Sequence, residues 1–112
     1  MNDKGHERSL DDIIKMLSQK LGEPVMKSSQ RLLIIITIWY SGRMRFHELQ
    51  RTLNMGKGSL SNHLETLSRN GLIKTRDIIT LSGPGKMVEL TDAGKDAVKE
   101  YIDLMKILFN GK

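Results

Sequence analysis

The polar side chains between residues 57 and 63 combine a cation, two hydroxyls, an amide and an imidazole in one short run. The candidate residues of this run are Lys57, Ser59, Ser61, Asn62 and His63, together with Gly58, which has no side chain. An Asn amide can form two hydrogen bonds with the edge of an adenine base, and a Ser hydroxyl can bond to a base or a phosphate. Glycines at 56 and 58 would let a phosphate approach backbone N–H groups at a helix N-terminus. These residues are candidates for contact with nucleic acid.

The positive charge of the chain is concentrated around the same run. The 112 residues include 18 Lys and Arg against 13 Asp and Glu, a net charge of +5. Residues 43–86 hold eight of the basic and three of the acidic residues, and the ten of each sign elsewhere cancel. A polyanion would therefore be attracted to the central segment. Within it, Arg76 and Lys86 are further candidates for contact with DNA.

The sequence offers little for catalysis or for metal binding. It has no Cys, and its three His show no metal-ligand spacing such as HExxH. It also lacks a P-loop and a GxGxxG motif, so we expect no cofactor, no metal and no enzymatic activity. The absence of Cys fits a reducing compartment.

The length of the chain predicts one domain with a core of its own. The longest apolar run, residues 32–40, is too short to cross a bilayer, which takes about 20 residues. No apolar segment of a signal peptide follows the N-terminus. We therefore expect a cytoplasmic protein without membrane contact, in which residues 1–9 form a flexible arm.

The first half of the chain predicts three helices and a small strand. Ser9 is a suitable N-cap for a helix that ends near Leu21. Residues 32–40 are rich in β-branched side chains and could form a buried strand, but flanking caps favour a helix that is central to the core. Residues 44–46 suggest a short strand and residues 47–53 a short helix, after which Asn54 could adopt the left-handed conformation.

The second half predicts a helix, a β-hairpin and a long last helix. Leu60, Leu64 and Leu67 form one apolar face of a helix over residues 57–70, which ends at Asn70-Gly71. Strands are expected over residues 72–79 and 86–90, joined by a turn at residues 82–85 with the sequence SGPG. Thr91 would cap the last helix.

Four motifs in this order resemble those of winged-helix transcriptional regulators of the MarR/ArsR type from prokaryotes. The motifs are FHEL at residues 46–49, SLSNHLETL at 59–67, NGLI at 70–73 and VELTDAG at 88–94. The resemblance implies a mainly α fold with a small β-hairpin (α+β), a winged helix-turn-helix over residues 10–90 and a C-terminal helix over residues 91–112. It further implies a recognition helix at 57–70 in the major groove and a basic wing at 72–90 on the backbone or in the minor groove.

The last helix has more apolar side chains than one packing face requires. Together with the first helix it could pair two copies of the chain, so we expect a homodimer. Its expected interface consists of Leu10, Ile14, Tyr101, Ile102, Met105, Leu108 and Phe109. A twofold dimer would place two recognition helices about 34 Å apart, which matches a pseudo-palindromic DNA site.

The sequence as a whole predicts a sequence-specific regulator that binds double-stranded DNA as a homodimer. We expect a repressor that occupies a promoter, because the chain has no additional domain to recruit a polymerase. The alternative is a winged helix that serves as a protein-interaction module in a larger assembly. Binding to RNA is less favoured because the basic hairpin carries no aromatic residue. The sequence identifies no small-molecule effector.

Overall fold

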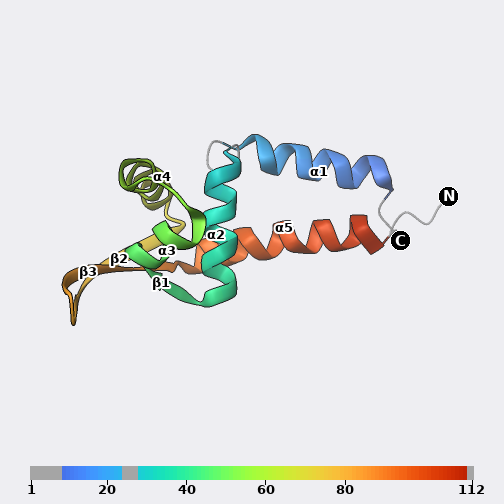
Figure 1. Cartoon of the computed structure of the whole chain (residues 1–112). Helices are drawn as coiled ribbons and strands as arrows, with labels where there is room; N and C mark the ends of the chain where they lie inside the picture. The colour runs from blue at the N-terminus through green and yellow to red at the C-terminus, as the bar shows by residue number, and fades with distance from the viewer. Residues whose placement is uncertain (1–8, 24–27, 111–112) are drawn as a thin grey trace.

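The computed structural model describes residues 9–23 and 28–110, so residues 1–8 of the expected arm lie outside the described part. The elements follow one another as five helices and three strands in the described residues (Figure 1). They are α1 (Leu10–Gly22), α2 (Ser29–Ser41), β1 (Arg43–Arg45), α3 (Phe46–Leu53), α4 (Lys57–Arg69), β2 (Ile73–Thr80), β3 (Gly83–Leu90) and α5 (Asp92–Asn110). This is the predicted mainly α fold with a small β-hairpin.

Side-chain caps define the first two helices. The Ser9 hydroxyl accepts a hydrogen bond from the Asp12 N–H (3.1 Å), and the Ser28 hydroxyl accepts one from the Arg31 N–H (3.3 Å). Gly42 ends α2 with a φ of +89°, and its N–H donates to the Ile38 carbonyl at 2.7 Å. A left-handed backbone of this kind favours glycine. The apolar run at 32–40 is therefore helical, as the caps predicted.

A tight turn joins α3 to α4. Asn54 follows α3 in the left-handed region (φ +52°, ψ +48°), as predicted, and the Met55 N–H donates to the Gln50 carbonyl. The chain then enters α4 through Gly56. After α4, Gly71 has a φ of +73°, and its N–H closes the helix on the Ser68 carbonyl. Helices α3 and α4 thus form the predicted helix-turn-helix.

The three strands form one antiparallel sheet in the order β1-β3-β2. Residues of β2 and β3 pair from Ile73 with Leu90 to Thr80 with Gly83, so the turn consists of Leu81 and Ser82. The prediction of a turn at 82–85 was therefore wrong, because Gly83 to Gly85 belong to β3. The Thr80 hydroxyl explains the shorter turn: it donates to the Gly83 carbonyl (2.7 Å) and accepts from the Ser82 N–H (3.2 Å).

The main core lies where α2, α3, α4, the base of the sheet and the start of α5 meet. Ile34, Ile35 and Ile38 of α2 are fully buried within it. The helix is central, as expected, but it is not buried on nearly every face. Leu33 is half exposed and Tyr40 is 91% exposed.

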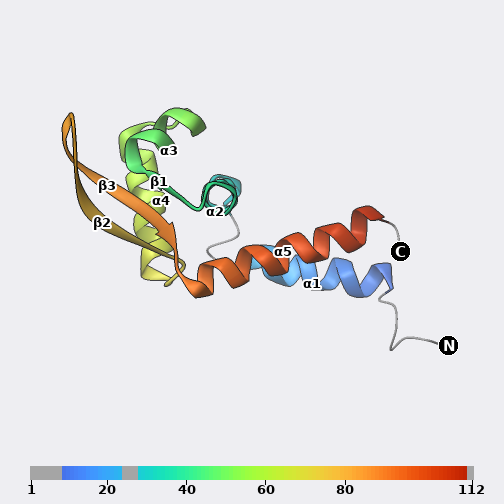
Figure 2. The same ribbon diagram turned by 90° about the horizontal axis from the view of Figure 1, so that it is seen from below.

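Helix α1 and the C-terminal part of α5 project together from the winged helix (Figures 1 and 2). They enclose a separate small cluster of three buried residues, Ile13, Leu17 and Leu104. Because of this projection the molecule is elongated, with extents of 62 × 23 × 21 Å. Its radius of gyration is 16.6 Å, against about 13 Å for a compact chain of this length. Within the described residues no helix has the length and apolar character needed to span a membrane.

Candidate nucleic-acid interface

Helix α4 has one buried face and one open face. Leu60, Leu64 and Leu67 lie in the main core. Five of the predicted DNA-contact residues are exposed on the other side, at the N-terminal half of the helix: Lys57, Gly58, Ser59, Ser61 and Asn62. Since the helix is held by three buried leucines, its polar N-terminal half stands on a rigid support.

The N-terminus of α4 has free backbone donors. Gly56 occupies the N-cap position, and no side chain caps the helix. A Cβ built on Gly56 or Gly58 would meet no atom within 4 Å. The first N–H groups of a helix have no partner within the helix, and they carry a partial positive charge. This turn is therefore suited to receive a phosphate.

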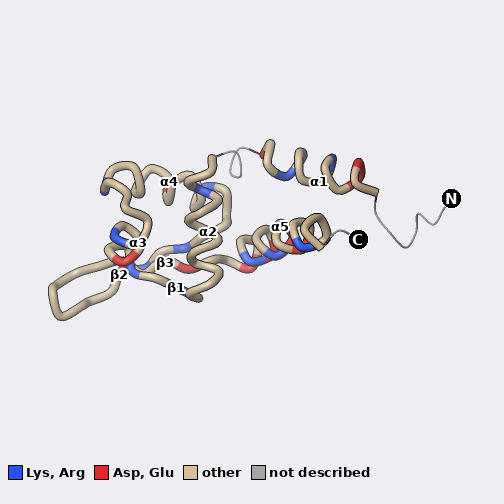
Figure 3. The backbone as a smooth tube through the Cα atoms, turned by 45° about the vertical axis from the view of Figure 1, so that its right-hand side comes forward, with Lys and Arg blue, Asp and Glu red and all other residues tan. Residues whose placement is uncertain are grey.

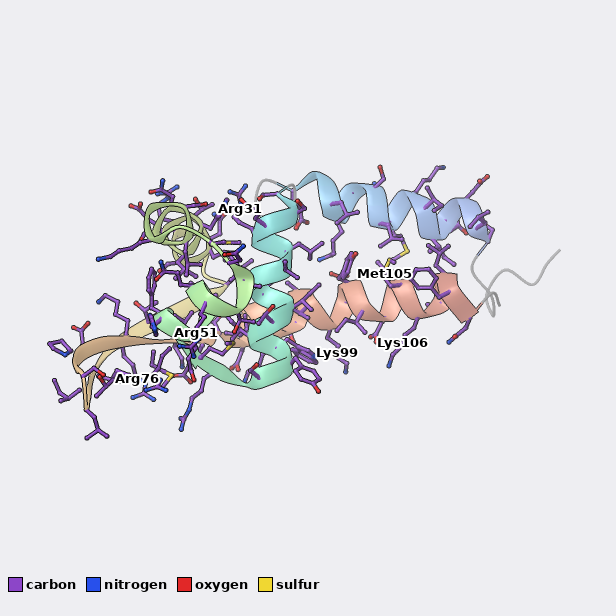
Figure 4. The ribbon with its side chains drawn as sticks, viewed as in Figure 1. Arg31, Arg51, Arg76, Lys99, Met105 and Lys106 are labelled. Carbon is purple, nitrogen blue, oxygen red and sulfur yellow. The ribbon has the colours of Figure 1, made fainter. Side chains whose placement is uncertain are left out.

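His63 differs from the other predicted contact residues because it packs against α2. Its Nε2 lies 2.8 Å from Gln30 Oε1, and its Nδ1 lies 3.4 Å from Arg31 Nη1. These contacts fit a neutral ring with the proton on Nε2 and with Nδ1 as acceptor. Burial, and then the nearby Arg31 cation, lowers the pKa of His63. Figure 4 shows Arg31 near the end of α2 that adjoins α4.

In the free protein His63 thus connects α4 to α2. The sequence reasoning missed Gln30 and Arg31, which lie more than 30 positions upstream of their partner. The one available signal was the position of His63 on the helix, at the border between the leucine face and the polar face.

The two predicted basic residues of the wing, the hairpin β2–β3, form ion pairs across its strands. Arg76 Nε lies 3.1 Å from Glu89 Oε2, and Lys86 Nζ lies 2.6 Å from Asp77 Oδ1. A hydrogen bond from each cation lowers the pKa of its carboxylate partner. All four side chains are accessible to solvent, so both cations can exchange these partners for phosphates.

Beyond these ion pairs the wing becomes apolar, which the sequence reasoning did not notice. Ile79 is 85% exposed and Leu81 is fully exposed. Pro84, opposite Ile79 on β3, is also exposed. The sequence signal was present, but the assignment of residues 82–85 to the turn left Leu81 without a role.

The turn after α4 is fastened to the start of α5. The Thr91 N–H donates to the Leu72 carbonyl (3.0 Å), and the Thr91 hydroxyl donates to the Gly71 carbonyl (2.5 Å). The same hydroxyl accepts from the Gly94 N–H (3.0 Å), which makes Thr91 the predicted cap of α5. Gly94 is buried so closely against Leu72 that a Cβ there would lie 2.0 Å from the Leu72 carbonyl oxygen.

The residues predicted for the dimer interface fall into two groups. Leu10, Ile14 and Phe109 are exposed apolar side chains on α1 and α5. The other four are partly buried and pack against the chain's own clusters: Tyr101, Ile102, Met105 and Leu108. Met105 points from α5 toward α1 in Figure 4.

On α1 and α5, which lie outside the central basic segment, basic and acidic side chains lie close to one another. Basic and acidic positions alternate along α5 in Figure 3, and Lys20 of α1 forms an ion pair with Glu100 of α5. An open groove between these helices is lined by residues that include Lys20, Asp96 and Glu100. In residues 9–23 and 28–110 there is no cluster of His, Asp or Glu suited to hold a metal ion.

Comparison with known proteins defines the class of this chain. Residues 31–109 match the family described as winged helix DNA-binding domain. The match extends from α2 to the end region of α5, and the chain belongs to this family. It is a DNA-binding protein of the transcriptional-regulator class. Proteins of this class are not enzymes.

Three relatives show how far the similarity extends. A transcriptional regulator homologue from Pyrococcus horikoshii is 33% identical, with 88% of this chain and 95% of that chain covered and a TM-score of 0.69. The Methanocaldococcus jannaschii protein MJ0432 is 26% identical over 78 residues, or 70% of this chain and 85% of the relative. A MarR variant from E. coli, solved with operator DNA, shares the fold at 19% identity, a TM-score of 0.61 and coverages of 93% and 79%. The resemblance to winged-helix transcriptional regulators is thus confirmed, and the MarR structure shares the fold.

Proposed function

We propose that the chain is a sequence-specific repressor that binds a pseudo-palindromic site in double-stranded DNA as a homodimer. The N-terminal half of α4 enters the major groove, where Asn62 reads a base and Ser59 and Ser61 bond to bases or phosphates. The wing supplies phosphate contacts through Arg76 and Lys86. His63 supports the recognition helix from behind through α2.

One observation carries this proposal, and it concerns the N-terminal turn of α4. No side chain caps this turn, open space surrounds its two glycines, and its polar side chains are exposed. The helix itself gains little from this combination, because a Ser, Asp or Asn at the N-cap would stabilise it by roughly a few tenths of a kcal/mol more than Gly56 does. Phosphate bound at the free N–H groups supplies the missing hydrogen-bond partners.

The homodimer is supported by the shape of the molecule. Three buried residues are a small core for two helices that project from the rest of the chain. Leu10, Ile14 and Phe109 expose apolar surface on these same helices. A second copy packed on the α1–α5 pair would bury this surface and hold two α4 helices at a fixed distance.

Selection of duplexes from a random pool by the purified chain tests the proposal. We expect the recovered sites to be two inverted half-sites with centres about 10 base pairs apart or a multiple of that spacing. The affinity should fall steeply as salt rises, because several phosphates are neutralised. If a protein-interaction module is the correct reading, the chain will enrich no sequence and show no salt-dependent binding.

A pair of matched variants tests the role of Asn62. Asn62→Ala should cost about 1–3 kcal/mol of discrimination at one base of each half-site. Ser68→Ala, an exposed position at the other end of α4, should leave binding unchanged. The repressor role is tested by transcription from a promoter that carries the selected site, which should decrease when the protein is added.

A further inference from the structure

The far end of the wing carries apolar side chains and no charge. Residues 78–85 have the sequence IITLSGPG, without Lys, Arg, Asp or Glu. Leu81 stands at the turn with its side chain fully in solvent, and Ile79 is 85% exposed. In Figure 3 the end of the hairpin accordingly shows neither the blue of Lys and Arg nor the red of Asp and Glu. A tip of this composition is poorly suited to remain in water.

The strand register places two of these side chains on one face of the hairpin. Ile79 pairs with Pro84, and cross-strand partners lie on the same side of a sheet. The pair follows Asp77 and Lys86 on this face, which begins at the base of the sheet with the buried Ile73 and Leu90. The apolar tip is therefore separated from the protein's own core by an ion pair.

The tip is held in a defined shape. Eight consecutive cross-strand pairs lead to it, and the Thr80 hydroxyl bridges both sides of the two-residue turn. Gly83 has a φ of +115°, which gives the turn a backbone that other residues rarely adopt. The apolar side chains are thus presented by a stiffened hairpin.

The position of the tip favours DNA as the molecule that covers it. In Figures 1 and 2 the hairpin extends beyond α4, at the end of the molecule opposite the projecting α1–α5 pair. Cations flank the tip on both strands, with Lys74 and Arg76 on β2 and Lys86 on β3. Glu89 and Asp77 pair with two of these cations, so the strands below the tip keep an excess of one positive charge, which complements the negative charge of a duplex.

We propose that Leu81 and Ile79 act as an apolar wedge that enters the minor groove and partly unstacks one base step, which kinks the operator. This inference rests on the proposed operator binding and adds to it a mode of contact. Apolar side chains inserted between base steps are a known way in which proteins bend DNA from the minor groove. The cations at the base of the wing would hold the flanking phosphates during this insertion.

A wedge of this kind adds a source of specificity that needs no hydrogen bond to a base. Pyrimidine–purine steps such as TA and CA unstack more easily than others. We therefore expect such a step at the position of the wing in each half-site, outside the bases that α4 contacts. Exchange of that step for a stiffer one should weaken binding by the wild-type chain.

The test compares Leu81→Ser and Ile79→Ser with the wild-type chain on a duplex recovered by wild-type selection. Ser82→Ala is the matched control, because it changes the same turn but keeps the apolar side chains. Affinity is measured by fluorescence anisotropy, and bending by energy transfer between dyes on the two duplex ends. A 2-aminopurine at the wing position reports unstacking through increased fluorescence. Circular dichroism confirms that each variant is folded.

We expect the wild-type chain and Ser82→Ala to bend the duplex and to raise the 2-aminopurine signal. Leu81→Ser should bind about tenfold more weakly, which corresponds to the loss of one buried leucine, and should lose the bend. Leu81→Met should retain both the affinity and the bend. Ile79→Ser should also weaken binding and reduce the bend, but by less than Leu81→Ser does.

Two results would overturn the wedge while leaving operator binding intact. In the first, Leu81→Ser binds and bends the duplex as the wild-type chain does. In the second, Leu81→Ser has normal DNA binding but an altered mass in sedimentation, which would make the tip a contact between copies of the chain. A wild-type chain that binds no duplex would instead overturn the proposed function together with the wedge.

Discussion

Replacement of Gly94 by alanine should destabilise the protein strongly. An added Cβ would lie 2.0 Å from the Leu72 carbonyl oxygen and 3.0 Å from the carbonyl carbon. Contacts between carbon and oxygen normally begin at about 3.3 Å, so the two backbone segments must move apart by about 1.3 Å. The same oxygen accepts the Thr91 N–H, and this hydrogen bond must weaken as the segments separate.

The magnitude follows from three contributions. Forced separation of well-packed groups costs about 3 kcal/mol at the upper end of the usual range, and a weakened backbone hydrogen bond adds about 1 kcal/mol. The greater helix propensity of alanine returns about 1 kcal/mol. The expected loss is therefore about 3 kcal/mol, which lowers the Tm of a chain of this size by about 12 °C.

Thermal unfolding followed by circular dichroism measures this effect. Gly22→Ala is the matched control, because Gly22 is also helical but a Cβ there meets no atom within 4 Å. It should leave the Tm unchanged or raise it slightly. If Gly94→Ala melts within about 2 °C of the wild-type chain, the close packing of α5 on Leu72 does not limit stability and the reasoning fails.

Three further predictions concern residues of the candidate DNA interface, two on DNA binding and one on stability. Asp77→Asn should raise DNA affinity about threefold at low salt, since one charge about 7 Å from a phosphate contributes about 0.6 kcal/mol in water; an anisotropy titration that shows weaker binding would contradict this. Gly58→Ala should raise the Tm but weaken DNA binding about tenfold if the backbone touches a phosphate, as a shift of about 1.4 kcal/mol; unchanged binding would show that the helix end stays clear of the duplex. The lowered pKa of His63 means that the unfolded chain takes up its proton first, so stability should be full above pH 6.5 and decline as the pH falls below it; chemical denaturation of His63→Gln should lack this part of the decline.

Local patterns sufficed to predict most elements of the fold. The caps at Ser9 and Asn54 and the left-handed Gly71 depend on neighbouring residues, and each occurs as the sequence indicated. The helix at 29–41 was distinguished from a strand by its flanking caps and by its length. Such features could be predicted because their causes lie within four residues of one another in the chain.

The wing turn could not be placed by the same reasoning. Gly and Pro at 83–85 usually mark a turn, but the hydroxyl of Thr80 closes the hairpin two residues earlier. Pro84 fits within β3 because this part of the strand pairs with β2 alone, so the side without a ladder needs no N–H donor.

Contacts between distant parts of the chain were equally beyond local patterns. The position of His63 at the edge of the leucine face can be read from the sequence, but its partners in α2 depend on how the two helices pack. The exposed α4 residues were predictable because the leucine spacing determines which side of the helix faces the core. Whether each of them contacts DNA stays a prediction.

The hydrogen bonds of Thr91 have a consequence for how α4 and α5 move relative to each other. Through Gly71 and Leu72 they join the first turn of α5 directly to the residues that end α4. These two bonds couple a rotation of α5 to a displacement of the C-terminal end of α4. In a dimer built on α5, a small change in the crossing angle of the two long helices would alter the separation of the recognition helices and so determine which operator spacing is accepted.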